Sequence, residues 1–169
     1  VASSRYGEAA PGPRLTAITP ADPALCEAAA AIGHLQAIAD RDGVLRRISP
    51  LLPTRSGMLP STALATFLVG TMASQKPPPT DHGWIRFYSG HESAGFHSIA
   101  AGQLLAGGDL TQLKDQIVVI GPATGSMAVS VGGQLGPAAL LATEVANFAN
   151  REYISRPEWA AWAEVAIAL

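Results

Sequence analysis

The sequence GHLQAIADRDGVLRRISPLLP, residues 33–53, is the stretch from which the fold is predicted most directly. Two short runs rich in apolar residues, 34–39 and 44–52, are joined by Asp-Arg-Asp-Gly, four residues typical of a tight turn. Pro50 and Pro53 close the second run, because proline cannot donate a hydrogen bond to a strand ladder. The pattern predicts a β-hairpin or another tight connection between two strands.

Helices are expected on both sides of this stretch. Upstream, PALCEAAAAIG begins at Pro23 and ends at Gly33, residue types that favour the first turn and the end of a helix. Downstream, a helix is predicted over about 61–73, and Ser61 follows a proline where its hydroxyl can cap the first turn. The apolar positions at helical spacing in this second helix are Leu64, Phe67, Leu68 and Met72.

The second half of the chain also alternates between strand and helix patterns. A strand is predicted over 84–88, a short helix over 97–106 and one further helical turn over 110–114. The run QIVVIG at 116–121 is continuously apolar, which is typical of a central strand that is buried on both faces.

A last core helix is predicted from the apolar stripe of Leu141, Val145 and Phe148, and it is expected to end near Glu152. Strands and helices therefore alternate along most of the chain. This order predicts a single α/β domain with one mixed β-sheet flanked by helices.

Length and composition exclude several classes of protein. With 169 residues, 48% of them apolar and 14% charged, the chain can bury a core as one domain and is not disordered. Its net charge of −2 offers no basic excess for a phosphate backbone, so nucleic-acid binding is not expected. Cys26 is the sole cysteine, which excludes an internal disulfide and a cysteine-rich zinc site.

The two ends of the sequence lead to separate predictions. The sequence begins at Val1 without a signal peptide, and we expect it to be a segment of a longer protein, with 1–22 as an extended arm. Towards the other end, Trp159 and Trp162 precede an apolar run at 165–169. Two interpretations stay open for this end: the start of a membrane helix, or an amphipathic helix that packs on the core.

The motifs of common enzymes do not occur in this sequence. The loop after the 116–121 run lacks the lysine of a phosphate-binding P-loop and the glycine spacing of a dinucleotide site. Ser126 lies in TGSMA, which does not match the nucleophile motif GxSxG of hydrolases. His91, Glu92 and His97 do not have metalloprotease spacing. We therefore predict no catalytic residue, metal or cofactor, and keep a hydrolase that uses Ser126 or His97 as a remote alternative.

Two places are candidates for ligand binding. Asp40, Asp42, Arg46 and Arg47 concentrate charge in a chain that has little of it. Either the aspartates shape the turn and pair with the arginines, or an arginine points into a cleft and holds an anionic ligand.

The second candidate is the loop that follows the 116–121 run, because open α/β sheets place ligands at the ends of such strands. The ligand-binding residues that we predict from the two places are Arg46, Arg47, Asp42, Gly121, Thr124 and Ser126.

Several motifs, in sequence order, resemble one known family. They are GHLQAIADRDGVLRRISPLLP at 33–53, LPSTALA at 59–65, AAGQLLAGGDLTQLKDQIVVIGPATG at 100–125 and a helix over 147–159 that ends in Arg-Pro. The pattern is similar to the second CHASE family, the cyclase/histidine-kinase-associated sensory extracellular domain of type two. The resemblance implies a sensory domain over 23–158, matching the C-terminal part of the family pattern, and a helix over 159–169 that leads to a membrane segment.

The resemblance also implies a function. Such a domain is expected outside the cytoplasm, in the periplasm or on the outer cell surface, tethered to the membrane. It passes a ligand-induced or packing-induced change through adjoining transmembrane helices to a cytoplasmic cyclase, kinase or diguanylate cyclase. The signal is a small molecule or a protein, no nucleic acid is involved, and a homodimer is one candidate assembly.

One departure from the family pattern bears on the ligand. The family continues after the IVVIG strand to an Asp, a Thr-Pro and a Glu, whereas residues 127–136 here contain no acid. The ligand is therefore expected to differ from that of other members or to be absent. The alternative function is a structural or protein-docking extracellular domain that binds no small molecule.

Overall fold

The computed structural model describes residues 19, 21–54, 57–71, 83–88, 95–122, 124–129, 133–152, 154 and 159–168. Within these residues the helices are α1 (Pro23–Ala28), α2 (Thr62–Gly70), α3 (Ala101–Leu105), the 3-10 turn η1 (Thr111–Leu113), α4 (Pro137–Asn150) and α5 (Ala160–Ala168). The strands are β1 (Leu51–Thr54), β2 (Gly57–Pro60), β3 (Met127–Ala128) and β4 (Gln134–Leu135). The arm predicted over 1–22 lies almost entirely outside the described residues.

The predicted turn at residues 40–43 forms, but the first arm of the predicted hairpin does not. The backbone N–H of Asp40 donates to the carbonyl of Val44 at 3.0 Å, and Gly43 takes the left-handed conformation with φ 80. Residues 35–39 form no strand. The antiparallel hairpin lies further along the chain instead, where β1 pairs with β2 and Leu51 is opposite Pro60.

Isolated backbone bridges join distant segments of the chain. Leu45 bridges Val129 in parallel, Arg47 bridges Trp84 in antiparallel, and Trp84 in turn bridges Ile154. β3 also pairs with β4 in antiparallel. The mixed α/β single domain is thereby confirmed, although regular pairing is limited to two two-stranded sheets.

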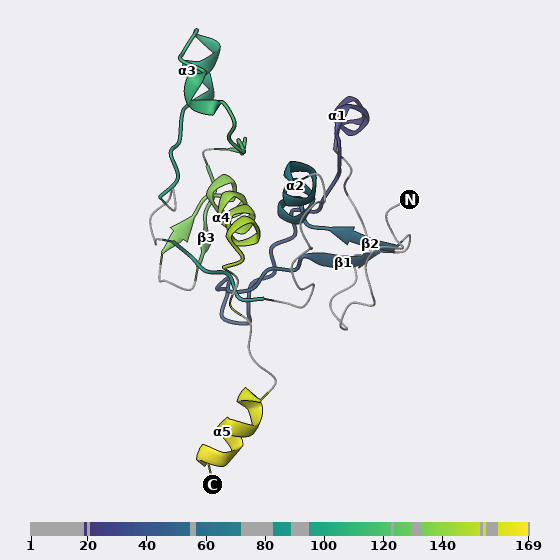
Figure 1. Ribbon diagram of the computed structural model, residues 1–169, viewed down its shortest axis with the longest axis vertical. Helices are drawn as coiled ribbons and strands as arrows, with labels where there is room; N and C mark the ends of the chain where they lie inside the picture. The colour runs from purple at the N-terminus through teal and green to yellow at the C-terminus, as the bar shows by residue number, and fades with distance from the viewer. Residues whose placement is uncertain are drawn as a thin grey trace.

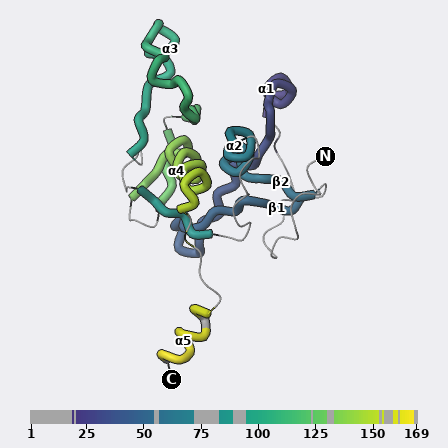
Figure 2. Tube along the Cα trace, in the orientation of Figure 1, coloured from purple at the N-terminus to yellow at the C-terminus, as the bar shows by residue number. Residues whose placement is uncertain are grey.

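The core lies where α2 and α4 pack together over the segment 45–52, as the tube in Figure 2 shows. The rings of Phe67 on α2 and Phe148 on α4 are 6.4 Å apart between centroids and tilted by 45°. Ser61 caps α2 as predicted, because its hydroxyl oxygen accepts a hydrogen bond from the N–H of Leu64 at 3.1 Å. The predicted core helix of the second half is confirmed as α4, in which Val145 and Phe148 are buried.

The prediction of a buried central strand over 116–121 was wrong. The described chain forms no strand there, and the side chains of Ile117, Val118 and Ile120 are 53%, 48% and 88% exposed. Their backbone groups make no ladder hydrogen bond with any other described residue. A continuous apolar pattern is typical of a strand, but it does not show whether a partner strand lies beside the segment.

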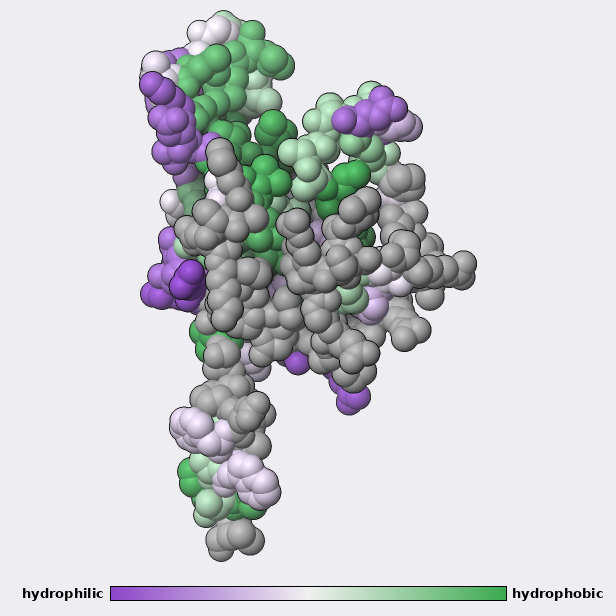
Figure 3. Space-filling model, turned by 45° about the vertical axis from the view of Figure 1, so that its right-hand side comes forward, coloured by the Kyte–Doolittle hydropathy of each residue, from purple (hydrophilic) through white to green (hydrophobic). Residues whose placement is uncertain are grey.

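The outer ends of the molecule are apolar and exposed. Figure 1 shows α5 apart from the body of the molecule and α3 at the opposite end of the long axis. Trp159 and Trp162 are 68% and 78% exposed, so within the described residues the C-terminal helix does not pack on the core. Hydrophobic residues also gather over the α3 end in Figure 3, where Leu105 and Leu110 are exposed.

Asn147 ties the 83–88 segment to α4. Its side chain is fully buried: Oδ1 accepts from the N–H of Arg86 at 2.8 Å, and Nδ2 donates to the carbonyl of Arg86 at 3.0 Å. The same nitrogen donates to the carbonyl of Thr143 at 2.9 Å. The amide thus pairs with both backbone groups of one residue, as a neighbouring strand would.

We expect Asn147→Ala to lower the free energy of unfolding by about 2 kcal/mol, because it leaves both backbone groups of Arg86 without their partner. Urea unfolding followed by circular dichroism measures the change. Gln103→Ala, which removes an exposed amide from α3, is the control and should change the stability by less than about 0.5 kcal/mol. Equal losses in the two variants would contradict the role of Asn147.

Candidate functional site

A cavity of about 150 Å³ lies between the 34–37 segment, the 120–122 segment and the first half of α4. Most of its wall is apolar, and the polar side chains are few. Its titratable groups are His34 and Glu144. The lining residues are His34, Leu35, Gln36, Ala37, Ser49, Ser61, Ile120, Gly121, Pro122, Met127, Pro137, Ala138, Leu140, Leu141 and Glu144.

The backbone of His34 is clamped between β2 and α2. Its N–H donates to the carbonyl of Pro60 at 2.9 Å, and its own carbonyl accepts from the N–H of Thr62 at 2.9 Å. Gly33 allows this approach, because a Cβ there would lie 2.5 Å from the backbone nitrogen of Thr62. The Gly-His pair of the opening motif therefore positions an imidazole at the cavity wall.

The imidazole of His34 has a defined tautomer. Nδ1 accepts a hydrogen bond from the N–H of Gln36 at 3.2 Å, so the neutral ring carries its hydrogen on Nε2. Nε2 is buried and has no well-aligned hydrogen-bond partner. Burial lowers the pKa of His34, and a backbone group of Ser49 opposes this only in part. The ring is therefore neutral, and its Nε2–H is buried beside a backbone group of Ser49.

Glu144 is the acid of the cavity. It is the single charged residue of α4, its side chain is half-buried, and desolvation is the sole influence on the pKa of its carboxyl. Burial raises the pKa of Glu144 from its usual 4.5 to about 7. The carboxyl therefore changes its charge near neutral pH.

The predicted loop reaches the cavity with Gly121 but not with its two hydroxyl residues. A Cβ on Gly121 would lie 2.8 Å from the Cβ of Ala138, so glycine lets the loop lie directly on α4. Thr124 and Ser126 are exposed, and neither lines the cavity. The Ser126 hydroxyl donates to Oε1 of Gln134 at 2.8 Å.

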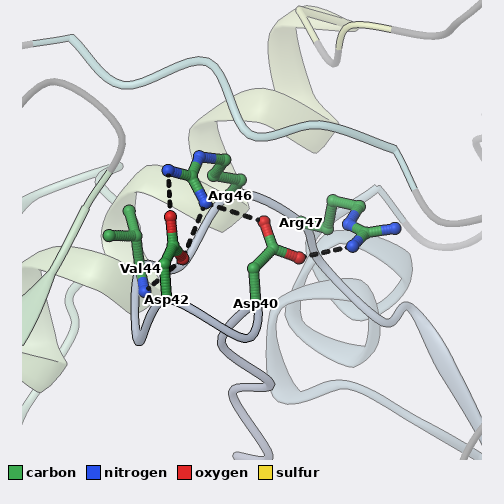
Figure 4. Close-up of polar contacts among 5 residues, drawn as sticks. All are labelled: Asp40, Asp42, Val44, Arg46 and Arg47. Atoms are coloured by element: carbon green, nitrogen blue, oxygen red, sulfur yellow. Dashed lines mark hydrogen bonds and ion pairs between the residues drawn. The ribbon is translucent and has the colours of Figure 1, made fainter.

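The predicted charged cluster forms a closed set of ion pairs away from the cavity wall (Figure 4). Arg46 donates to Asp40 at 3.0 Å and to both carboxylate oxygens of Asp42 at 2.9 and 2.7 Å. Arg47 donates to the other oxygen of Asp40, with its guanidinium 6.0 Å from the Trp84 ring centroid.

These contacts lower the pKa of both acids of the cluster. The hydrogen bond from Arg46 lowers the pKa of Asp42 to about 2, and Arg47 followed by Arg46 lowers the pKa of Asp40. Asp42 also accepts from the N–H of Val44 at 3.1 Å, which holds the turn. The geometry favours the structural interpretation of the arginines, while their assignment as ligand-binding residues stays a prediction.

The described residues do not form a catalytic or metal-binding constellation. No group of three potential metal ligands occurs among them, and His91 and Glu92 lie outside them. The Ser126 hydroxyl donates to an amide oxygen, which cannot take its proton as a general base would. The remote hydrolase alternative gains no support from this geometry.

Sequence reasoning missed both titratable residues of the cavity. A signal for Glu144 was present, because one acid in an otherwise uncharged helix such as PAALLATEVANFAN is unusual. The position of His34 was inside the opening motif, but its role depends on the clamp by Pro60 and Thr62. The sequence could not show that the two residues line one cavity, since they are 110 positions apart.

The fold defines a mixed α/β domain with a cavity beside the first half of α4. Comparison with known proteins assigns this domain: the model of the CHASE2 domain family matches residues 4–169. The chain belongs to the CHASE2 family. No curated protein and no solved structure matches it.

The family assignment confirms the resemblance found in the motifs. CHASE2 domains are extracellular sensory domains of signalling proteins and are not catalytic. Among the described helices, none is long and apolar enough to cross a membrane. The family match confirms the predicted class of sensory domain.

The raised pKa of Glu144 predicts a pH dependence of stability. Between 4.5 and about 7 the folded chain binds more protons than the unfolded chain, so the free energy of unfolding falls as the pH rises. We expect Glu144→Gln to remove this fall and to be more stable than the wild type at pH 8 by up to about 3 kcal/mol.

Urea unfolding at pH 5 and pH 8 measures this difference, with Glu27→Gln on the exposed α1 as control. The lowered pKa of His34 acts in the opposite direction, because it lowers the free energy of unfolding as the pH falls below 6.5. This effect is the same in the wild type and in Glu144→Gln. A difference between Glu144→Gln and wild type that is independent of pH would contradict the assignment.

Proposed function

We propose that this chain is the signal-input domain of a membrane-bound signalling protein and lies outside the cytoplasm. The observation that carries the proposal is the CHASE2 match over residues 4–169, because that family consists of extracellular sensory domains. The exposed apolar helix α5 supports a path into the membrane, because Trp162 within it and Trp159 just before it are typical of the membrane interface.

The proposed mechanism is a shift between two arrangements of the domain. A ligand, or a change of packing between two copies, stabilises one arrangement and displaces α5 relative to the body. α5 joins the body through the segment after Ile154, which itself bridges Trp84 at the sheet. The displacement passes to adjoining transmembrane helices and then to a cytoplasmic cyclase, kinase or diguanylate cyclase.

The location is tested with Cys26, the sole cysteine of the sequence, which is partly exposed on α1. A membrane-impermeant maleimide is added to intact cells that express the full-length gene product. We expect Cys26 to be labelled to the same extent before and after the cytoplasmic membrane is permeabilised. Cys26→Ser is the control that removes this signal and reports labelling at any other position.

Labelling of Cys26 only after permeabilisation would place the domain in the cytoplasm and overturn the proposal. The result does not depend on knowing the signal, because it reports location alone.

The path into the membrane predicts that α5 binds lipid. Val165 and Ile167 are 54% and 86% exposed, and insertion into a bilayer would remove this apolar surface from water. We expect phosphatidylcholine vesicles to shift the tryptophan emission to shorter wavelength. Ile167→Lys places a charge on the helix and should abolish the shift, while Trp84 contributes equally to both proteins. An unchanged shift in Ile167→Lys would show that α5 is not the lipid-binding element.

A second candidate function is protein docking without a small-molecule ligand. Ile117, Val118 and Ile120 favour it, since they form an exposed apolar segment whose backbone is unpaired within the described chain. This candidate predicts that no metabolite raises the melting temperature at high excess, whereas a ligand-binding sensor must be stabilised by its ligand.

A further inference from the structure

The apolar segment after η1 is held against the body at both ends, but its backbone is unpaired. We call residues 116–122 the edge segment. Near its start, a Cβ on Gly70 of α2 would lie 3.8 Å from Cδ1 of Ile117, and near its end Gly121 lies directly on α4. Between these two contacts its backbone groups make no hydrogen bond with any other described residue. Such backbone groups, presented beside a folded body, can pair with a strand from another chain.

The apolar surface around the edge segment has the size of a dimer interface. Figure 3 shows hydrophobic residues continuing from the α3 end along this face. Five branched side chains of this part of the chain are about half exposed or more: Leu105, Leu110, Ile117, Val118 and Ile120. Together they expose roughly 400 Å² of apolar surface. A stable interface buries about 800 Å² per partner, somewhat more than half of it apolar, so this surface matches what one partner of a dimer contributes.

The edge segment is suited to pair with a second copy of itself. It contains no charged residue, so two copies can lie side by side without like charges meeting. Two antiparallel strands of identical sequence are related by a two-fold axis perpendicular to their sheet, which places residues of the same face opposite each other. With Val119 at this axis the whole segment is paired, and Val118 lies opposite Ile120 of the partner subunit.

Charges near the two ends of the edge segment favour the antiparallel arrangement. Lys114 lies in the turn before the segment and makes no ion pair with the described residues. At the other end, Glu144 lines a cavity together with Gly121 and Pro122. An antiparallel pair brings Lys114 of each copy to the end where Glu144 of the partner subunit lies, whereas a parallel pair would bring two lysines together.

We propose that the edge segment is a dimer interface, in which two copies of this chain pair as antiparallel strands about Val119. The branched side chains of the two copies cover each other, and the backbone groups that are unpaired in one chain pair across the interface. This assigns the docking surface of Ile117, Val118 and Ile120 to a second copy. A role of this dimer in signalling rests on the proposed sensory function, whereas the dimer itself does not.

Sedimentation equilibrium of the 169-residue chain at pH 8 measures the assembly. We expect a mass twice that of one chain at micromolar concentration. Ile120→Lys, at a side chain that is 88% exposed, places an amine in the interface and should weaken the dimer at least about tenfold, while circular dichroism shows that the fold is kept. Leu25→Lys on α1 and Ile167→Lys on α5 replace exposed apolar residues elsewhere and should leave the dimer unchanged.

A chain that stays monomeric up to millimolar concentration would overturn the proposal. A dimer that Ile120→Lys leaves intact would also overturn it, because the interface would then lie elsewhere; loss of the dimer in Ile167→Lys would place it at α5.

The charges test the antiparallel arrangement. Lys114→Glu places an acid near Glu144 of the partner subunit and should weaken the dimer about fivefold at pH 8, above the pKa of Glu144. Adding Glu144→Gln to this variant removes the repulsion and should restore most of the affinity. A dimer that is insensitive to Lys114→Glu would contradict this arrangement.

Cysteine pairs test the register without relying on affinity. In a Cys26→Ser background, Val118→Cys chains are mixed with Ile120→Cys chains and oxidised with copper phenanthroline. We expect a disulfide-linked dimer in the mixture and little in either variant alone, because residues 118 and 120 lie opposite each other only across the interface. Equal cross-linking in all three samples, or none in any, would reject the register about Val119.

This proposal and the proposed location can fail separately. A monomeric chain, with Cys26 labelled in intact cells, would reject the dimer interface and keep the extracytoplasmic sensory domain. A dimer that Ile120→Lys disrupts, with Cys26 protected in intact cells, would keep the interface and reject the location.

Discussion

The packing of α2 against α4 is the contact on which the rest of the structure depends. It brings Phe67 onto Phe148 and buries Leu45, Ile48 and Leu51 beneath both helices. α4 then supplies Asn147 to hold the 83–88 segment and Glu144 to the cavity. With little regular strand pairing among the described residues, burial of apolar side chains between these helices is the main source of order.

The same contact explains why polar groups remain in the cavity. The first half of α4 faces the 34–37 segment, which is held by backbone hydrogen bonds of His34 rather than by a regular strand. A side chain on α4 that points toward this segment meets apolar neighbours and few hydrogen-bond partners. Glu144 occupies that position, and its raised pKa is the direct result.

Local signals in the sequence predicted local features well. The turn at 40–43, the cap at Ser61 and the apolar stripe of α4 were all predicted, because each depends on residues a few positions apart. The 116–121 strand was not predicted correctly, because a strand needs a partner and the apolar pattern carries no information about it. Of the residues predicted in the following loop, Gly121 lines the cavity, whereas Thr124 and Ser126 are exposed.

The sequence alone determined the family, the α/β class, the main helices and the charged turn, since these follow from ordered motifs, periodicity and neighbouring residues. The tertiary structure alone decided which polar groups share a cavity. His34 and Glu144 line one cavity because the clamp at Thr62 and the packing of α4 bring distant segments together. Their chemistry depends on burial, a property of the folded chain that residue order does not express.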